Sequence, residues 1–250
     1  RARLRTYAPY WGIVVAYLMF RFLYFGGMGD LEGLDNVQKA SDYISVQPLV
    51  ILRYVALLFV PKGLAIDHYL VPAEYPLGLK ILAALFVFAS AGGALWLLCK
   101  RSETWAKLAG FGCLWFLLCL APTSSVLPTV DFMVERRVYL AAFGLLALPW
   151  GAAEIVGKRR QEAWIVLGFY AAFLASVAIA RNSDFESNEK AWLKVAEIYP
   201  TSPRALNTLA NIYVDKKDYA GAVALYEKLI ALNANDYFAT TNLGSLYADE

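Results

Sequence analysis

The sequence predicts an all-α protein in which a polytopic bundle of transmembrane helices precedes an α-solenoid of short helix pairs. Two observations support this prediction. Of the 250 residues, 59% are hydrophobic and 15% are aromatic, which is too apolar for a soluble domain of this length. Beyond residue 181 the long apolar runs stop and a 34-residue period begins. We therefore divide the chain into a transmembrane helical domain, 1–181, and a soluble repeat domain, 182–250.

The balance of charge changes at the same boundary. The formal net charge is +2, from 23 Lys and Arg against 21 Asp and Glu. Residues 1–181 hold 17 of the basic and 11 of the acidic side chains, whereas residues 182–250 hold 6 and 10. Basic residues beside membrane helices set topology and contact lipid headgroups, so this excess does not indicate a nucleic-acid partner.

Five apolar stretches are long enough, or nearly so, to cross a bilayer, which takes about 20 residues. These stretches are 8–25, 77–99, 105–121, 138–156 and 162–180. A sixth stretch, 47–61, is shorter and contains Arg53, so we expect an interfacial or re-entrant helix there. The residues between the first span and this helix, 26–46, form a loop that is rich in glycine and of mixed charge.

Basic clusters predict how the spans alternate. Lys and Arg cluster at the start of the chain and after the second and fourth spans. If all three clusters face the cytoplasm, the five spans alternate correctly only when 47–61 does not cross. The loops 26–76 and 121–138 and everything after Arg181 then share the periplasmic or lumenal side. This topology predicts a protein of the bacterial inner membrane or the endoplasmic reticulum.

The period of 34 residues is that of the tetratricopeptide repeat, a pair of packed helices. Four residues of one repeat, Ala205, Leu209, Tyr213 and Asp215, recur as Ala239, Leu243, Tyr247 and Asp249. We expect a second helix at 185–199, a full repeat at 202–235 and the first helix of another. Because such arrays need about three repeats for stability, we expect the chain to be a piece of a longer protein.

Three groups of polar residues interrupt the apolar sequence on the predicted outer side. They are Arg53, the adjacent Asp67 and His68, and the cluster of Asp131, Glu135, Arg136 and Arg137. Charges at the mouth of a membrane helix are costly to desolvate, so the cluster is either a pocket wall or a solvated loop. Two adjacent arginines suit a phosphate or pyrophosphate, because guanidinium groups bind such oxygens bidentately.

The acidic residues and the histidine allow two interpretations each. Glu135 either orients an arginine for ligand binding or simply neutralises its neighbour. Asp67 and His68 are either a general-base pair or an exposed pair in a loop. No phosphate-binding glycine loop, zinc-protease motif or serine-hydrolase motif occurs in the sequence.

The order of these segments resembles one known family. Its most specific part is LAPTSSVLPTVDFMVERRVYL, residues 120–140, followed by two spans and the repeats. This pattern is similar to the C-terminal membrane half of the transmembrane and tetratricopeptide-repeat O-mannosyltransferases and their bacterial relatives, in the GT-C glycosyltransferase superfamily. Within it, Glu135, Arg136 and Tyr139 match the signature E-R-x-x-Y.

The resemblance implies a polytopic enzyme that transfers a sugar from a polyprenyl-phosphate donor to a hydroxyl of a protein or other acceptor. The family's catalytic acid lies in a first outer loop that this chain lacks, so we assign no catalytic residue and expect the fragment alone to be inactive. The repeats would hold a protein or peptide in their groove. No metal ligand is predicted, and a need for a divalent metal is left open. The expected substrate-binding residues are Arg53, Asp67, His68, Glu135, Arg136 and Arg137.

Two other functions are compatible with the sequence. A non-enzymatic, membrane-anchored scaffold subunit would use the repeats to hold partners in a larger membrane complex. A transporter-like subunit is disfavoured, because no span carries a buried pair of ionisable residues. An acidic pair in an upstream outer loop would favour the transferase over the scaffold.

Overall fold

The structure is a computed structural model, and the residues it describes are 12–13, 15–17, 19–20, 23, 40–124, 129, 131–145, 160–234 and 236–249. Within these residues the regular secondary structure is helical and there are no strands. Most of the predicted span at 8–25, most of the predicted loop at 26–46 and the second half of the predicted span at 138–156 lie outside the described residues. So do the basic clusters at the start of the chain and at 158–159.

The first part of the chain consists of apolar helices. They are α2 (Ala40–Phe59), α3 (Leu77–Lys100), α4 (Thr104–Leu120), α5 (Val138–Leu145) and α7 (Arg160–Arg181), with the short 3₁₀ helices η2 (Pro72–Glu74) and η3 (Glu135–Arg137). Among the described residues, three stretches are helical, long and apolar enough to cross a membrane: Ser41–Phe59, Leu77–Lys100 and Trp164–Phe185. Helix α4 is also apolar but has 17 residues, at the lower limit for a span.

Helix α2 is longer than the sequence predicted. We expected a loop up to residue 46 and a short helix at 47–61, but the helix begins at Ala40 and ends at Phe59. Residues Tyr43, Val46 and Val50 are buried at helical spacing, with polar residues between them. This amphipathic turn lacks the continuous apolar run that marks a span, and Pro48 lies inside the helix, where proline is normally disfavoured. Both features concealed the start of the helix.

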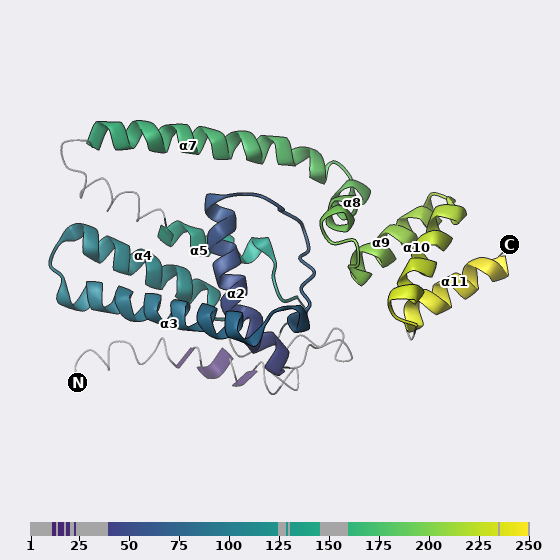
Figure 1. Ribbon diagram of the computed structural model, residues 1–250, viewed down its shortest axis with the longest axis horizontal. Helices are drawn as coiled ribbons and strands as arrows, with labels where there is room; N and C mark the ends of the chain where they lie inside the picture. Colours follow the sequence, from purple (N-terminus) through teal and green to yellow (C-terminus); the bar gives the residue numbers. More distant parts are fainter. Residues whose placement is uncertain are drawn as a thin grey trace.

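The helices take two directions. Helices α3, α4 and α5 pack side by side, and α7 runs in the same general direction, whereas α2 runs across them (Figure 1). The Tyr170 hydroxyl of α7 lies 3.1 Å from the Leu58 carbonyl oxygen and 2.8 Å from that of Phe59, which ties α7 to the end of α2. Because α2 crosses α3 and α7, these three helices cannot all stand upright in one bilayer.

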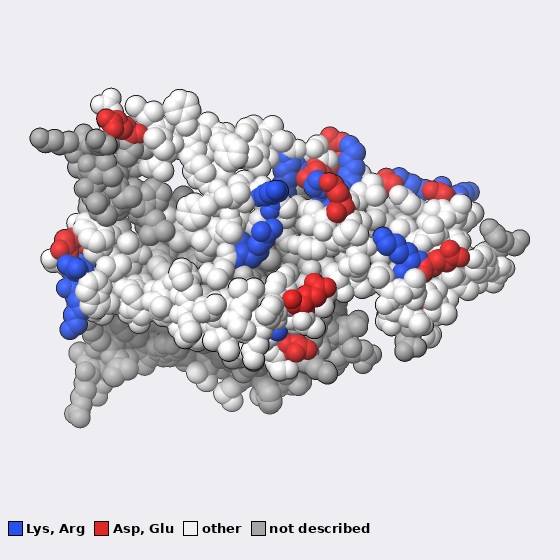
Figure 2. Space-filling model, viewed as in Figure 1, with Lys and Arg blue, Asp and Glu red and all other residues white. Residues whose placement is uncertain are grey.

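The loops and the tail gather at one end of this bundle. The loop 60–76, the segment 131–137 and the end of α7 lie at the end where the tail begins, and the turn between α3 and α4 lies at the other (Figure 1). On the face shown in Figure 2, charged side chains gather at the left edge and over the right half, with a largely uncharged stretch between them. The uncharged stretch matches the apolar helices.

A buried cluster joins α2 to α4 and α5. Its members are Val50, Tyr54, Leu57, Phe116, Leu120, Met133, Val138 and Ala141. The Tyr54 hydroxyl donates to the Val134 carbonyl oxygen and accepts from the Val134 amide, both at 2.9 Å. Tyr54 therefore fixes the segment 131–137, which carries most of the charged residues that the sequence singled out.

The tail is made of paired helices. They are α8 (Asn188–Ile198), α9 (Pro203–Asp215), α10 (Tyr219–Leu232) and α11 (Tyr237–Asp249), and a 3₁₀ turn, η5 (Asn182–Phe185), precedes them. Helices α9 and α11 begin at 203 and 237 and end at 215 and 249, so each boundary recurs after 34 residues. Ser187, Ser202 and Asp218 cap α8, α9 and α10 through their side chains, which stabilises each start.

The close packing of α4 against α3 depends on a glycine, which gives a test of the fold. A Cβ atom at Gly110 would lie 2.6 Å from the Ala94 carbonyl oxygen and 2.9 Å from Leu98 Cγ. Gly110→Ala should therefore lower the melting temperature of the detergent-solubilised protein, because overpacking costs about 1–3 kcal/mol. Gly92→Ala is the matched control, since a Cβ there meets nothing within 4 Å. Equal melting temperatures by circular dichroism would contradict the packing of α3 on α4.

Candidate functional site

The polar residues of the loops converge on the carboxylate of Glu135. Its Oε1 accepts hydrogen bonds from the Ala65 amide (2.7 Å) and from His68 Nε2 (3.0 Å), and its Oε2 lies 2.6 Å from Arg181 Nη1. The side chains of Glu135 and Arg181 are 19% and 21% exposed. Burial raises the pKa of Glu135, but the hydrogen bonds from His68, Ala65 and Arg181 outweigh it and hold the pKa below its ordinary value.

His68 connects this carboxylate to the tail. Its side chain is fully buried, and Nδ1 lies 2.8 Å from the hydroxyl oxygen of Tyr199, at the end of α8. With Nε2 donating to Glu135, a neutral ring accepts from Tyr199 and a charged ring donates to it. Either way both ring nitrogens have a hydrogen-bond partner. The expectation that His68 is part of an exposed pair in a loop is therefore wrong, because the residue is buried. One nitrogen thus contacts a carboxylate and the other a hydroxyl, and both contacts lie within the protein.

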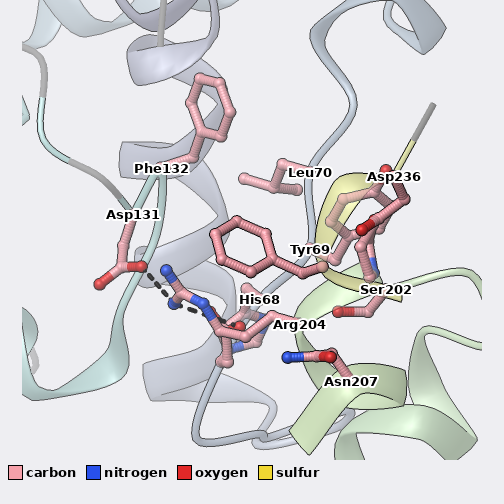
Figure 3. Close-up of a pocket in the computed structure, with 12 residues that line it drawn as sticks. His68, Tyr69, Leu70, Asp131, Phe132, Ser202, Arg204, Asn207 and Asp236 are labelled. Carbon is pink, nitrogen blue, oxygen red and sulfur yellow. Dashed lines mark hydrogen bonds and ion pairs between the residues drawn. The ribbon is translucent and has the colours of Figure 1, made fainter. Parts of the chain in front are cut away.

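A second polar cluster lies beside the first and lines a cavity of about 380 Å³. Arg204, near the start of α9, reaches Asp131 Oδ1 at 2.5 Å and Asp67 Oδ2 at 3.5 Å (Figure 3). Burial raises the pKa of the Asp67 carboxyl, and the neighbouring charge of Asp131 raises it further. Arg204 lowers it, but the pKa of Asp67 remains above its ordinary value. The rest of the lining is His68, Tyr69, Leu70, Phe132, Ser202, Pro203, Asn207, Asp236 and Phe238.

A third feature is an apolar groove that contains Arg53. The groove has a volume of about 460 Å³ and runs along one face of α2. Arg53 is exposed and donates a hydrogen bond to the Lys62 carbonyl oxygen (3.2 Å). Tyr75 and Tyr199 add hydroxyl groups to a wall that is otherwise apolar: Val46, Leu49, Val50, Leu52, Ala56, Leu70 and Met133. Neither Asp67 nor any charged residue of 131–137 lines this groove with Arg53, although Met133 does.

The two adjacent arginines point to different surroundings. Arg137 donates from Nη1 to the Asp131 carbonyl oxygen (3.1 Å) and from Nη2 to Thr129 Oγ1 (3.0 Å). Its side chain therefore binds residues of the segment that precedes it. Arg136 is exposed, as is Tyr139, at 91%. Neither arginine lines the two cavities described above. The structure therefore does not bring Arg136 and Arg137 together as one phosphate clamp.

The most important partners of these residues were not singled out by the sequence. Arg181, Tyr199 and Arg204 come from the end of α7, the end of α8 and the start of α9. Arg181 looked like an ordinary basic residue at the end of a span, and the other two like helix-boundary residues of a repeat. Their positions just after the last span were the available signal, since this is where a tail must meet the outer loops.

Together, the fold and the site define an all-α protein with helices able to cross a membrane and a polar junction where its tail begins. No protein-family model, no curated protein and no solved structure matches the chain. Among the described residues, no group of three or more His, Cys, Asp or Glu side chains is arranged to hold a metal ion.

The junction at Glu135 predicts a pH-dependent contribution to stability. Glu135→Gln should destabilise the protein at neutral pH by about 1–3 kcal/mol, because it leaves Arg181 without its charged partner. Since the pKa of Glu135 lies below the ordinary 4.5, this contribution is complete above about pH 5 and is lost as the pH falls through the lowered pKa.

Melting temperatures of the wild type and of Glu135→Gln, measured in detergent from neutral to acidic pH, test this. The gap between them should close as the solution becomes acidic. Glu103→Gln is the matched control, because Glu103 forms a solvent-exposed pair with Arg101 and such pairs contribute little. A gap that stays constant with pH would contradict the ionised junction.

Proposed function

We propose that this chain is part of a membrane glycosyltransferase of the GT-C type. It would transfer a sugar from a polyprenyl-phosphate donor to a hydroxyl of a protein or other acceptor on the outer side of the membrane. The tail would form tetratricopeptide repeats, for which the recurrence of helix boundaries after 34 residues is the support. The observation on which the proposal chiefly rests is an apolar groove that carries an exposed arginine, at the end of the bundle where loops and tail meet.

The arrangement of charge along the bundle supports the proposed topology. The loop 60–76, the segment 131–137 and the tail lie at one end, while the turn between α3 and α4 lies at the other (Figure 1). This turn contains Arg101 and follows Lys100, the last residue of α3. With the basic end in the cytoplasm, the polar junction and the repeats face the periplasm or lumen. If α3 and α7 cross the bilayer, α2 lies close to the membrane plane, as an interfacial helix would.

The groove beside Arg53 suits the donor lipid. Its aliphatic wall can cover a prenyl chain, since burying apolar surface contributes about 25 cal/mol per Å². A guanidinium group has five N–H donors, and Arg53 uses one on the Lys62 carbonyl oxygen. The remaining donors and the hydroxyl of Tyr75 can bind phosphate oxygens, whereas the Tyr199 hydroxyl already contacts His68 Nδ1.

The other charged residues then take separate roles. Glu135 and His68 hold the loops and the tail in place, and Arg137 shapes the segment that precedes α5. Arg136 is exposed near the start of α5 and is free to approach a lipid phosphate from outside the groove. Arg53 becomes the principal phosphate ligand and Arg136 a secondary one.

The role of Arg53 can be tested through bound lipid. Arg53→Gln in the full-length protein should reduce co-purified or added polyprenyl phosphate by about tenfold, because a charge-assisted hydrogen bond contributes about 1.5–3 kcal/mol. Arg101→Gln is the matched control at the opposite end of the bundle. Native mass spectrometry or lipid extraction measures the binding, and equal occupancy in both variants would remove Arg53 from the site.

The role of Arg136 can be tested through transfer. Arg136→Ala in the full-length protein should greatly lower transfer of radiolabelled sugar from a polyprenyl-phosphate donor in proteoliposomes, because less charge is left to stabilise the leaving phosphate. Membrane insertion should stay unchanged. Wild-type rates in the variant would refute the role. A full-length wild type that binds no polyprenyl phosphate and transfers no sugar would favour the scaffold subunit instead.

A further inference from the structure

We infer that the cavity between Asp67, Asp131 and Asp236 binds a cationic side chain, lysine or arginine, of a polypeptide. The cavity is built jointly by the loops of the membrane part and by the starts of α9 and α11 in the tail. This inference goes beyond the proposed function, because it concerns a separate site and holds whether or not the protein transfers a sugar.

The charges that line the cavity do not balance. Three carboxylates, those of Asp67, Asp131 and Asp236, face one guanidinium, that of Arg204. Arg204 already pairs with both Asp67 and Asp131. Asp236 accepts a hydrogen bond from the Ala239 amide at 2.9 Å, and no cation within the described part of the chain pairs with it. The lining therefore carries a net charge of −2 when all three carboxylates are ionised.

The walls between the charges are aromatic. Tyr69, Phe132 and Phe238 come from three different segments, and Leu70 adds an aliphatic surface. In the view of Figure 3, Tyr69 lies between the Arg204 pairs and Asp236. Aromatic faces attract ammonium and guanidinium groups, and the methylene stem of such a side chain packs on apolar walls. A carboxylate beside aromatic rings thus fits a lysine or an arginine better than it fits a neutral side chain.

The same charge argues against a phosphate in this cavity. An anion would meet three carboxylates, and the one guanidinium is already shared by two of them. The exposed Arg53 lines the other groove, and Leu70 is common to the linings of both. The segment 67–70 therefore separates a cavity suited to a cation from a groove suited to an anion.

The test uses the full-length protein in a neutral detergent and a short fluorescent peptide with two lysines between glycines. Fluorescence anisotropy gives its affinity, beside matched peptides with serine or glutamate in place of lysine. The lysine peptide should bind most tightly. Asp236→Asn should weaken it by about tenfold, because asparagine keeps the helix cap but not the charge. Glu227→Gln, which removes an exposed charge from α10 outside the cavity, should leave the affinity unchanged.

A second variant separates the charge effect from a loss of folding. Arg204→Gln removes the cation that competes for Asp67 and Asp131, so it should strengthen binding of the lysine peptide severalfold, whereas a damaged cavity would weaken it. Affinity that falls in both variants, or that changes in neither, overturns the inference. So does tighter binding of the serine or glutamate peptide. Because no donor lipid takes part, the outcome is independent of the test of Arg53.

Discussion

The carboxylate of Glu135 is the contact on which the arrangement of this molecule depends. A charge that is largely removed from water is tolerated only when hydrogen bonds or opposite charges replace the lost hydration. Glu135 receives them from the Ala65 amide, from His68 and from Arg181. One side chain thereby joins the loop after α2, the segment before α5 and the end of α7. His68 extends the connection to Tyr199, at the end of α8.

This junction sets the position of the tail. Ala65 of the loop is buried against Val195 of α8 and Ala205 of α9, so apolar packing surrounds the ionic contact. Held there, α9 presents Arg204 to the carboxylates of Asp67 and Asp131. The cavity at this place is therefore a composite, because neither the loops nor the helix pairs contain all of its walls. A ligand in it would contact both parts of the chain at once.

The sequence predicted the parts of the fold that depend on local signals. The span at 77–99 corresponds to Leu77–Lys100, and the 34-residue period agrees with the recurring boundaries of α9 and α11. The start of α2 was missed because its buried residues are separated along the sequence and do not form a continuous apolar run. The adjacent arginines were taken as a pair, but in a 3₁₀ helix successive side chains point about 120° apart. Arg136 is accordingly exposed while Arg137 turns into its loop. The partners Arg181 and Arg204 depend on tertiary structure, which no local pattern reveals.

The segment 67–70 has different chemistry on its two sides. On one side lie Arg53 and the aliphatic face of α2, and on the other lie carboxylates and aromatic rings contributed partly by the tail. A lipid-linked phosphate would occupy the groove beside Arg53, and a basic polypeptide would occupy the cavity lined by carboxylates. The carboxylates would repel the phosphate and Arg53 would repel the basic side chain, so charge would keep each ligand out of the other site. Such an arrangement would bring a lipid ligand and a polypeptide ligand to neighbouring sites. Because Glu135 holds this segment through His68 and the adjacent Ala65 amide, the junction that positions the tail would also position both ligands.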